Sequence, residues 1–155
     1  MFITADELPN LRQGMYYHDA VHELLQELYG VGNGLKPGDW EKLQARADSE
    51  LLLMYEIPDA PAILCMVQGT YSFRPPYPKV YVNSVIVRRW LRGQGYGQLI
   101  MREFHARCMK RWPDVALFQL TSAPRRNTRS FYEKLGYIAR AHDSGNETTA
   151  FEMRV

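Results

Sequence analysis

Apolar side chains in the first third of the chain recur at helical spacing. Between His18 and Tyr29 they return every three or four residues, which predicts an amphipathic helix that ends before Gly30. The loop that follows is rich in glycine, and Asp39 is a plausible N-cap for a second short helix that reaches about Ala47. This region therefore predicts two helices, with a strand before them left open.

From Glu50 onward the pattern changes to apolar runs, the third of which is dense in β-branched residues. Three such runs lie at residues 51–57, 62–73 and 79–87, separated by short breaks that contain proline. Runs of this length and composition predict strands, and their short connections predict an antiparallel meander.

The second half of the chain alternates helix and strand. Residues 95–112 carry an apolar stripe at helical spacing, and the run 115–120 predicts a strand. A short helix is expected at 127–135, followed by weaker strands near 137–141 and 148–154. A strand, a helix and a strand in succession imply one right-handed parallel crossover. We therefore expect an α/β (α+β) fold with a mixed sheet and helices on both faces.

Length and composition fit one compact domain. The 155 residues are 46% hydrophobic, which is enough for a core and excludes a disordered chain. No apolar run approaches the roughly 20 residues that cross a bilayer, and the N-terminus lacks a secretion-signal pattern. Cys65 and Cys108 each stand alone in an apolar pattern, which indicates buried thiols and a reducing, cytoplasmic setting. The four histidines lack metal-ligand spacing, so no metal site is expected.

The net charge of +2 hides an asymmetry along the chain. Residues 1–87 carry 6 basic and 11 acidic side chains, whereas residues 88–140 carry 12 basic and 3 acidic ones. A concentrated positive segment favours an anionic ligand. The acidic N-terminal part in turn favours a cationic ligand, such as an amine or a basic peptide.

The segment VIVRRWLRGQGYGQLIM, residues 85–101, carries the most chemical information. A predicted strand ends at Val87, three glycines follow at alternate positions, and a helix begins among them. Alternate glycines let backbone N–H groups approach a ligand, the helix N-terminus adds unpaired donors, and Arg92 adds a full charge. This combination suits a phosphate or diphosphate. The spacing differs from G-x-G-x-x-G and from the P-loop, and it fits R-G-x-G-x-G.

On two motifs the chain resembles the GNAT superfamily of acetyl-coenzyme A-dependent N-acetyltransferases. The first is VIVRRWLRGQGYGQLI, and the second is FYEKLGY at residues 131–137. The resemblance implies one GNAT domain over residues 1–155, with a cofactor-binding core at 50–140 and acceptor-side helices within 1–49. It also implies a mixed, mostly antiparallel sheet of six to seven strands, splayed in the middle, with about four helices on both faces.

The resemblance further implies how acetyl-coenzyme A is bound. The backbone of Val85, Ile86 and Val87 would hydrogen-bond the pantetheine arm as an added strand would. The diphosphate would be held at the glycine turn, by Arg92, Gly93, Gln94, Gly95, Tyr96, Gly97 and Gln98.

Residues before the second motif depart from the family pattern. Relatives often carry an Asn seven residues before the catalytic Tyr, where Arg125 stands here, and Asn127 is the nearest candidate for that cofactor contact. Contact with the 3′-phosphate of the cofactor and a solvated helix start are equal alternatives for Arg125, Arg126 and Arg129.

Tyr132 is the catalytic residue that the resemblance implies, as the acid that protonates the leaving thiolate. A backbone N–H at Val85 or a neighbour would stabilise the oxyanion. Relatives often carry Glu where Asn83 stands here, and Asn is no general base at neutral pH. Glu56, a bound water and bulk solvent are open alternatives for the base.

The expected function is transfer of an acetyl group from acetyl-coenzyme A to a primary amine of a small molecule or peptide, in a ternary complex. One alternative is a non-catalytic acyl-coenzyme A sensor of the same fold. The other is a nucleic-acid-binding module built on the Arg-rich segment, which lacks a recognised reading motif. The expected partner is the amine acceptor, without nucleic acid or membrane, and a homodimer is left open.

Overall fold

The structure is a computed structural model that describes residues 2–4, 11–55, 63–74, 76–123, 128–140 and 148–155. Its elements follow the predicted order, and the strand before the first helix, which the sequence left undecided, is present. The elements are β1 (Phe2–Thr4), α1 (Leu11–Tyr29), α2 (Asp39–Ala45), β2 (Ser49–Tyr55), β3 (Ile63–Ser72), β4 (Lys79–Val87), a 3₁₀ turn (Arg89–Leu91), α3 (Tyr96–Arg111), β5 (Leu117–Ser122), α4 (Arg129–Glu133), β6 (Ile138–Arg140) and β7 (Thr149–Arg154).

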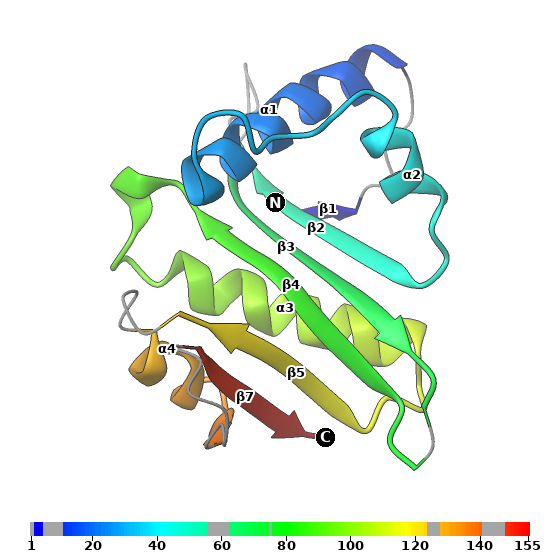
Figure 1. Ribbon diagram of the computed structural model, residues 1–155, viewed down its shortest axis with the longest axis vertical. Helices are drawn as coiled ribbons and strands as arrows, with labels where there is room; N and C mark the ends of the chain where they lie inside the picture. The colour runs from blue at the N-terminus through cyan, green and yellow to red at the C-terminus, as the bar shows by residue number, and fades with distance from the viewer. Residues whose placement is uncertain (1, 5–10, 56–62, 75, 124–127, 141–147) are drawn as a thin grey trace.

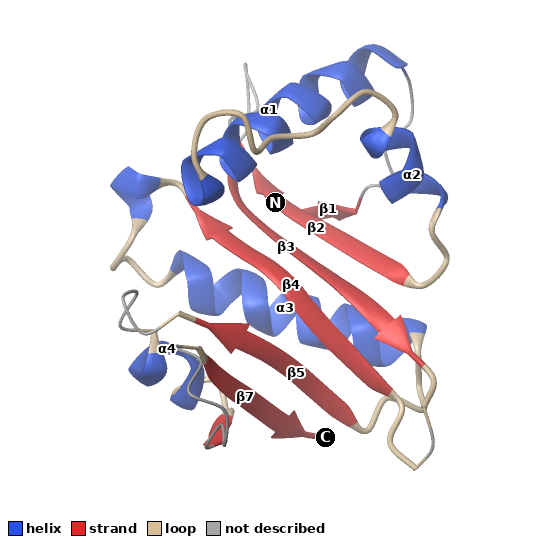
Figure 2. Cartoon of the chain, in the orientation of Figure 1, coloured by secondary structure: helices blue, strands red, loops and turns tan. Residues whose placement is uncertain are grey.

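All seven strands form one mixed sheet in the order β1-β2-β3-β4-β5-β7-β6. Only β4 and β5 run parallel, because α3 carries the chain back along the sheet between them (Figure 1). Helices cover both faces of the sheet (Figure 2). The predicted fold class is therefore confirmed, including the single parallel crossover.

Each face of the sheet has its own apolar core. On one face, Val21 and Leu24 of α1 and Trp40 of α2 pack against β2, β3 and Ile86. On the other face, α3 and α4 pack against the strands through a larger cluster centred on Phe104 and Phe118, both fully buried. Within the described ranges, no helix combines the length and apolar content needed to traverse a bilayer.

Strand β4 has two neighbours at one end and a single neighbour at the other. It pairs with β3 over its whole length, from Lys79 to Val87, but with β5 only through Lys79, Val80 and Tyr81. Beyond Tyr81 the two strands diverge (Figure 1). The sheet is therefore splayed, as expected, and the second half of β4 has an edge unpaired by any described strand.

A β-bulge sets which way the side chains of this edge point. The register between β3 and β4 shifts by one, so that Asn83 is an extra residue of β4. Val82 before the bulge and Val85 after it both join the α3-side core, whereas strict alternation would place them on opposite faces. The bulge thus turns Ile86 toward α1 and its neighbours toward α3.

Element ends differ from the prediction in a few places. Helix α1 begins at Leu11, well before His18. The N-cap of α2 is Gly38 in a left-handed conformation, so the expectation for Asp39 was wrong; Asp39 is the first helical residue. Its carboxylate instead accepts the backbone N–H of Lys36 at 2.9 Å, and this bond lowers its pKa. The structure therefore uses the carboxylate to close the preceding turn rather than to cap the helix.

Candidate active site

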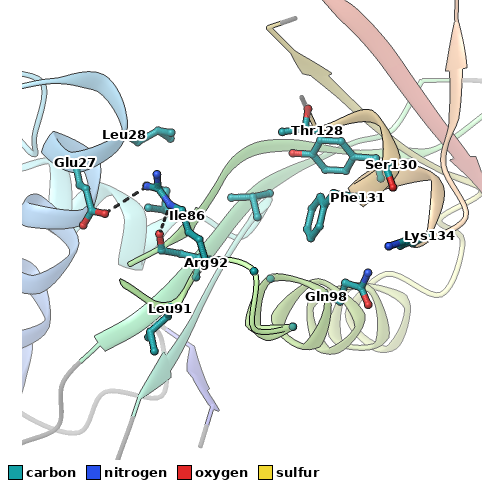
Figure 3. A pocket seen from close by; sticks show the side chains of 16 residues that line it. Glu27, Leu28, Ile86, Leu91, Arg92, Gln98, Thr128, Ser130, Phe131 and Lys134 are labelled. Carbon is teal, nitrogen blue, oxygen red and sulfur yellow. Dashed lines mark hydrogen bonds and ion pairs between the residues drawn. The ribbon is translucent and has the colours of Figure 1, made fainter. Parts of the chain in front are cut away.

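A cleft of about 850 Å³ lies where β4 and β5 diverge. Four elements form its walls: the end of α1, the edge of β4, the turn before α3, and α4 (Figure 3). The lining residues are Glu27, Leu28, Val85, Ile86, Val87, Leu91, Arg92, Gly93, Gly95, Gly97, Gln98, Thr128, Ser130, Phe131, Tyr132 and Lys134.

Most of the predicted site residues meet in this cleft. Both the strand segment 85–87 and Tyr132 line it, together with Arg92, the three glycines and Gln98. Gln94 and Tyr96 do not: the Gln94 side chain donates to the carbonyl of Trp90 at 2.9 Å, and Tyr96 packs against the α3-side core. Asn127, Arg125, Arg126 and Glu56 lie outside the described residues.

The glycines of the turn meet two different requirements. Gly93 and Gly95 have φ values of +78° and +88°, which side chains with a Cβ rarely adopt, and a Cβ built on either would have no atom within 4 Å. Gly97 instead allows close packing, because its Cβ would lie 3.0 Å from the Phe131 ring. The turn is thus shaped by two left-handed residues that leave open space, and α3 approaches α4 closely behind it.

Arg92 is fixed at one end of the cleft by two contacts. Its Nε donates to the carbonyl of Val87 at 3.1 Å, and its terminal nitrogen lies 3.3 Å from the Glu27 carboxylate. The same Glu27 oxygen accepts the backbone N–H of Arg89 at 2.7 Å. Glu27 therefore ties the end of α1 to the turn that precedes α3, and a dashed line in Figure 3 marks its contact with Arg92.

Tyr132 lies on the opposite wall and is 8% exposed. Its ring packs against Phe131, Tyr137 and Phe151, with centroid distances of 4.9, 5.7 and 5.1 Å. Its backbone is held by α4, where its N–H donates to the Thr128 carbonyl at 3.1 Å. The phenol therefore has one defined orientation and still borders the cleft.

A buried polar pair supports this wall from behind. His105 of α3 is 6% exposed, and its Nε2 lies 2.9 Å from the Tyr137 hydroxyl. Its ring packs in a tilted arrangement against Phe118, with the ring centroids 4.5 Å apart. Burial lowers the pKa of His105 to about 4, so the imidazole is neutral at physiological pH. Burial also raises the pKa of the Tyr137 hydroxyl. The pair joins α3 to the chain after α4 without an ionic charge.

The two residues that precede the strand segment 85–87 are hydrogen-bonded polar groups. Asn83, exposed on the bulge, accepts a hydrogen bond from the Thr70 hydroxyl at 3.0 Å. Ser84 lies 3.0 Å from the Tyr29 hydroxyl of α1. Neither residue is an ionisable base, so the strand brings hydrogen-bonding groups but no carboxylate to this point.

Metal ligation has no support within the described part of the chain, where no cluster of His, Cys, Asp and Glu could hold an ion. Both cysteines are free and buried, as the sequence predicted. Burial raises the pKa of Cys65 to about 12, which keeps its sulfur a thiol and a poor nucleophile.

The acidic and basic halves of the sequence are partly joined by ion pairs. Arg88 lies 3.0 Å from Glu23, Arg92 lies 3.3 Å from Glu27, and Arg111 lies 2.5 Å from Glu50. Each pair links the acidic segment 1–87 to the basic segment 88–140. These carboxylates therefore hold the fold and the turn together.

Several lining residues were missed by sequence reasoning. Glu27 and Leu28 come from α1, and only the fold brings them to the cleft. Ser130 directly precedes the second motif, and Lys134 lies within it, one helical turn later. This spacing is a usable signal because such residues share one side of a helix.

The sheet is splayed, and a glycine turn lies where β4 and β5 diverge. This arrangement agrees with the class of acetyltransferase that the chain resembles on its two motifs. The family model described as "Acetyltransferase (GNAT) domain" matches residues 57–139, more than half of the chain. The chain therefore belongs to the GNAT acetyltransferase family.

Several solved structures share this fold at low sequence identity. Escherichia coli ElaA is 18% identical, with 99% of this chain and 98% of that chain covered and a TM-score of 0.70. The GNAT domain of S. lividans PAT is 11% identical, with coverage of 99% and 89% and a TM-score of 0.73. Arabidopsis thaliana NAA60, solved with a bisubstrate analogue, is 9% identical, with coverage of 100% and 99% and a TM-score of 0.70. No curated protein matches the chain at significant similarity.

Proposed function

We propose that the protein transfers an acetyl group from acetyl-coenzyme A to a primary amine of a small molecule or peptide, by direct attack in a ternary complex. One observation carries the proposal: the open edge of β4, the glycine turn and Tyr132 line the same cleft. Family membership supports the use of an acyl-coenzyme A. The cofactor supplies the activated thioester.

The residues of the cleft fit such a cofactor. Val85 and Val87 have backbone groups on an edge that no described strand pairs, and a pantetheine amide can hydrogen-bond there. Gly93 and Gly95 leave open space beside backbone N–H groups at the start of α3, and Arg92 adds a charge. These groups would hold a diphosphate at the turn and the pantetheine arm along the strand.

Two residues then carry the chemistry in this proposal. The backbone N–H at Val85 would stabilise the oxyanion that forms on the thioester carbonyl. The Tyr132 hydroxyl would donate its proton to the departing sulfur, from a ring already fixed by its packing. Most of the rate would come from positioning the amine and the thioester together.

Replacing Tyr132 with Phe tests this assignment, since Phe keeps the ring and removes only the hydroxyl. We expect kcat for amine acetylation to fall about 100-fold, within the usual range for a positioned acid, while the coenzyme A dissociation constant changes less than twofold. Tyr81→Phe is the matched control, because Tyr81 bonds Thr121 outside the cleft.

The same measurement separates an enzyme from an acyl-coenzyme A sensor. If the wild-type protein binds coenzyme A but acetylates none of a broad panel of primary amines, the result supports the sensor function and contradicts the catalytic one. If Tyr132→Phe keeps full activity, Tyr132 is a packing residue only.

The amine acceptor and a reducing, cytoplasmic setting complete the proposal. Two free, buried thiols fit a compartment in which disulfides do not form. A nucleic-acid partner is less well supported, because Arg88, Arg92 and Arg111 of the basic segment each pair with a carboxylate. Titration with a random duplex should show no salt-dependent binding.

A further inference from the structure

The cleft has positive charge at two separate places. Arg92 lies beside Glu27, and Lys134 lines the cleft from the α4 side, apart from Arg92 (Figure 3). The glycine turn follows Arg92 in the chain, and it lines the cleft together with Arg92 and Lys134. A ligand that spans the cleft can therefore meet two distinct cationic groups.

These two groups differ in their surroundings. Arg92 already has a carboxylate partner, at 3.3 Å. Lys134, at the end of α4, has no ion pair or side-chain hydrogen bond in the described part of the chain. The nearest acid along α4, Glu133, is engaged by Arg129 at 2.8 Å. Lys134 therefore offers an uncompensated charge to whatever occupies its end of the cleft.

Ser130 adds a second polar group at the same place. It precedes Lys134 by four residues, so both lie on one side of α4, and both line the cleft. For Arg129 the sequence left a phosphate contact and a solvated helix start as equal alternatives; its side chain does not line the cleft and is held by Glu133. The geometry therefore favours Lys134 over Arg129 for a phosphate contact.

We propose that Lys134, assisted by Ser130, binds the 3′-phosphate of coenzyme A and makes the protein select coenzyme A over 3′-dephospho-coenzyme A. The inference rests on the proposed cofactor. Coenzyme A carries a diphosphate and a separate ribose 3′-phosphate, and the cleft offers the turn with Arg92 for the first and Lys134 for the second. A lysine ammonium serves a phosphate as a point charge with three donors.

The test measures the dissociation constants of coenzyme A and 3′-dephospho-coenzyme A by calorimetry, for the wild type and for Lys134→Met. In the wild type we expect coenzyme A to bind about fivefold tighter, as befits one solvent-exposed ionic contact. In Lys134→Met this ratio should fall to about one, with the affinity for 3′-dephospho-coenzyme A nearly unchanged. Lys134→Arg should keep the preference.

Lys110→Met is the matched control, because Lys110 is an exposed lysine of α3 outside the cleft, and it should keep the wild-type ratio. A ratio that survives in Lys134→Met overturns the proposal. Equal weakening of both ligands also overturns it, since Lys134 would then serve the diphosphate. A wild type that binds neither ligand refutes the proposed function itself, and a wild type that binds both equally refutes only the role of Lys134.

Discussion

The two ends of β4 are built differently. At the end that begins with Lys79, the strand is paired on both sides, and the Lys79 ammonium donates to the Gln119 side chain across the parallel pair at 2.8 Å. At the end that reaches Val87, the strand is paired only with β3 among the described strands, and it borders the cleft. The closed end supplies stability, and the open end leaves backbone groups for a ligand.

The ion pairs repeat this contrast. At the closed end, Glu50 of β2 is 4% exposed and contacts Arg111 at the end of α3. At the open end, the Arg92 side chain is 51% exposed beside Glu27. An Arg–Glu ion pair is therefore largely buried at the closed end and within reach of a ligand at the open end. Replacing the arginine of each pair should have different effects.

The largest expected effect comes from closing the space at the turn. Gly95→Val places a branched side chain where the diphosphate is proposed to lie, and we expect no measurable coenzyme A binding by calorimetry. Gly32→Val is the control for backbone strain, because Gly32 has a similar φ of +92° and open surroundings but lies in the α1–α2 loop. Both variants should lose about 1 to 2 kcal/mol of stability to strain. Equal loss of binding in both would show that strain, not the site, is responsible.

Replacing Arg111 should mainly lower stability, whereas replacing Arg92 should mainly weaken coenzyme A binding. Arg111→Met takes the guanidinium away from a buried carboxylate, and we expect it to lower the free energy of unfolding by about 2 to 3 kcal/mol. Arg92→Met should change stability by less than about 0.5 kcal/mol, because its pair is exposed, but should weaken coenzyme A binding about fivefold. Urea unfolding and calorimetry on both variants check this; a reversed pattern would contradict the division between the two ends.

A smaller effect is expected on the pH dependence of stability, and it comes from His105 of α3. His105 has a folded pKa of about 4, below its ordinary value of 6.5, so the unfolded chain takes up the proton first as the pH falls. Its contribution is therefore complete above pH 6.5 and is lost progressively between pH 6.5 and 4. From pH 7.5 to 5 we expect the wild type to lose about 2 kcal/mol more than His105→Gln. Equal losses in urea unfolding would refute the buried, neutral imidazole.

Sequence patterns predicted the bounds of β4 better than its register against the neighbouring strand. The bounds 79–87 of β4 were predicted correctly, because a dense β-branched run leaves little choice of structure. The bulge at Asn83 was not predicted, since it depends on register against β3 and not on the β4 sequence alone. Without it, alternation would have assigned Val85 and Ile86 to the wrong faces.

The candidate site divides in the same way. The turn and Tyr132 belong to local motifs, and sequence reasoning found them. Glu27 was missed because it reaches the cleft from α1, more than sixty residues before Arg92 in the chain. The charge asymmetry predicts an anionic ligand for the basic segment and a cationic one for the acidic segment. Three of the acidic residues, however, are the ion-pair partners of Arg88, Arg92 and Arg111. Long-range pairing of this kind carries no local pattern.

The central claim is that the open edge of β4 and the glycine turn bind an acyl-coenzyme A together. Amide hydrogen exchange, measured with and without saturating coenzyme A, tests it most directly because it reports each segment of backbone separately. The claim predicts new protection at residues 85–87 and 93–98, and little change at residues 79–81, which are already paired on both sides. Binding that protects other segments and leaves these two unchanged would contradict it.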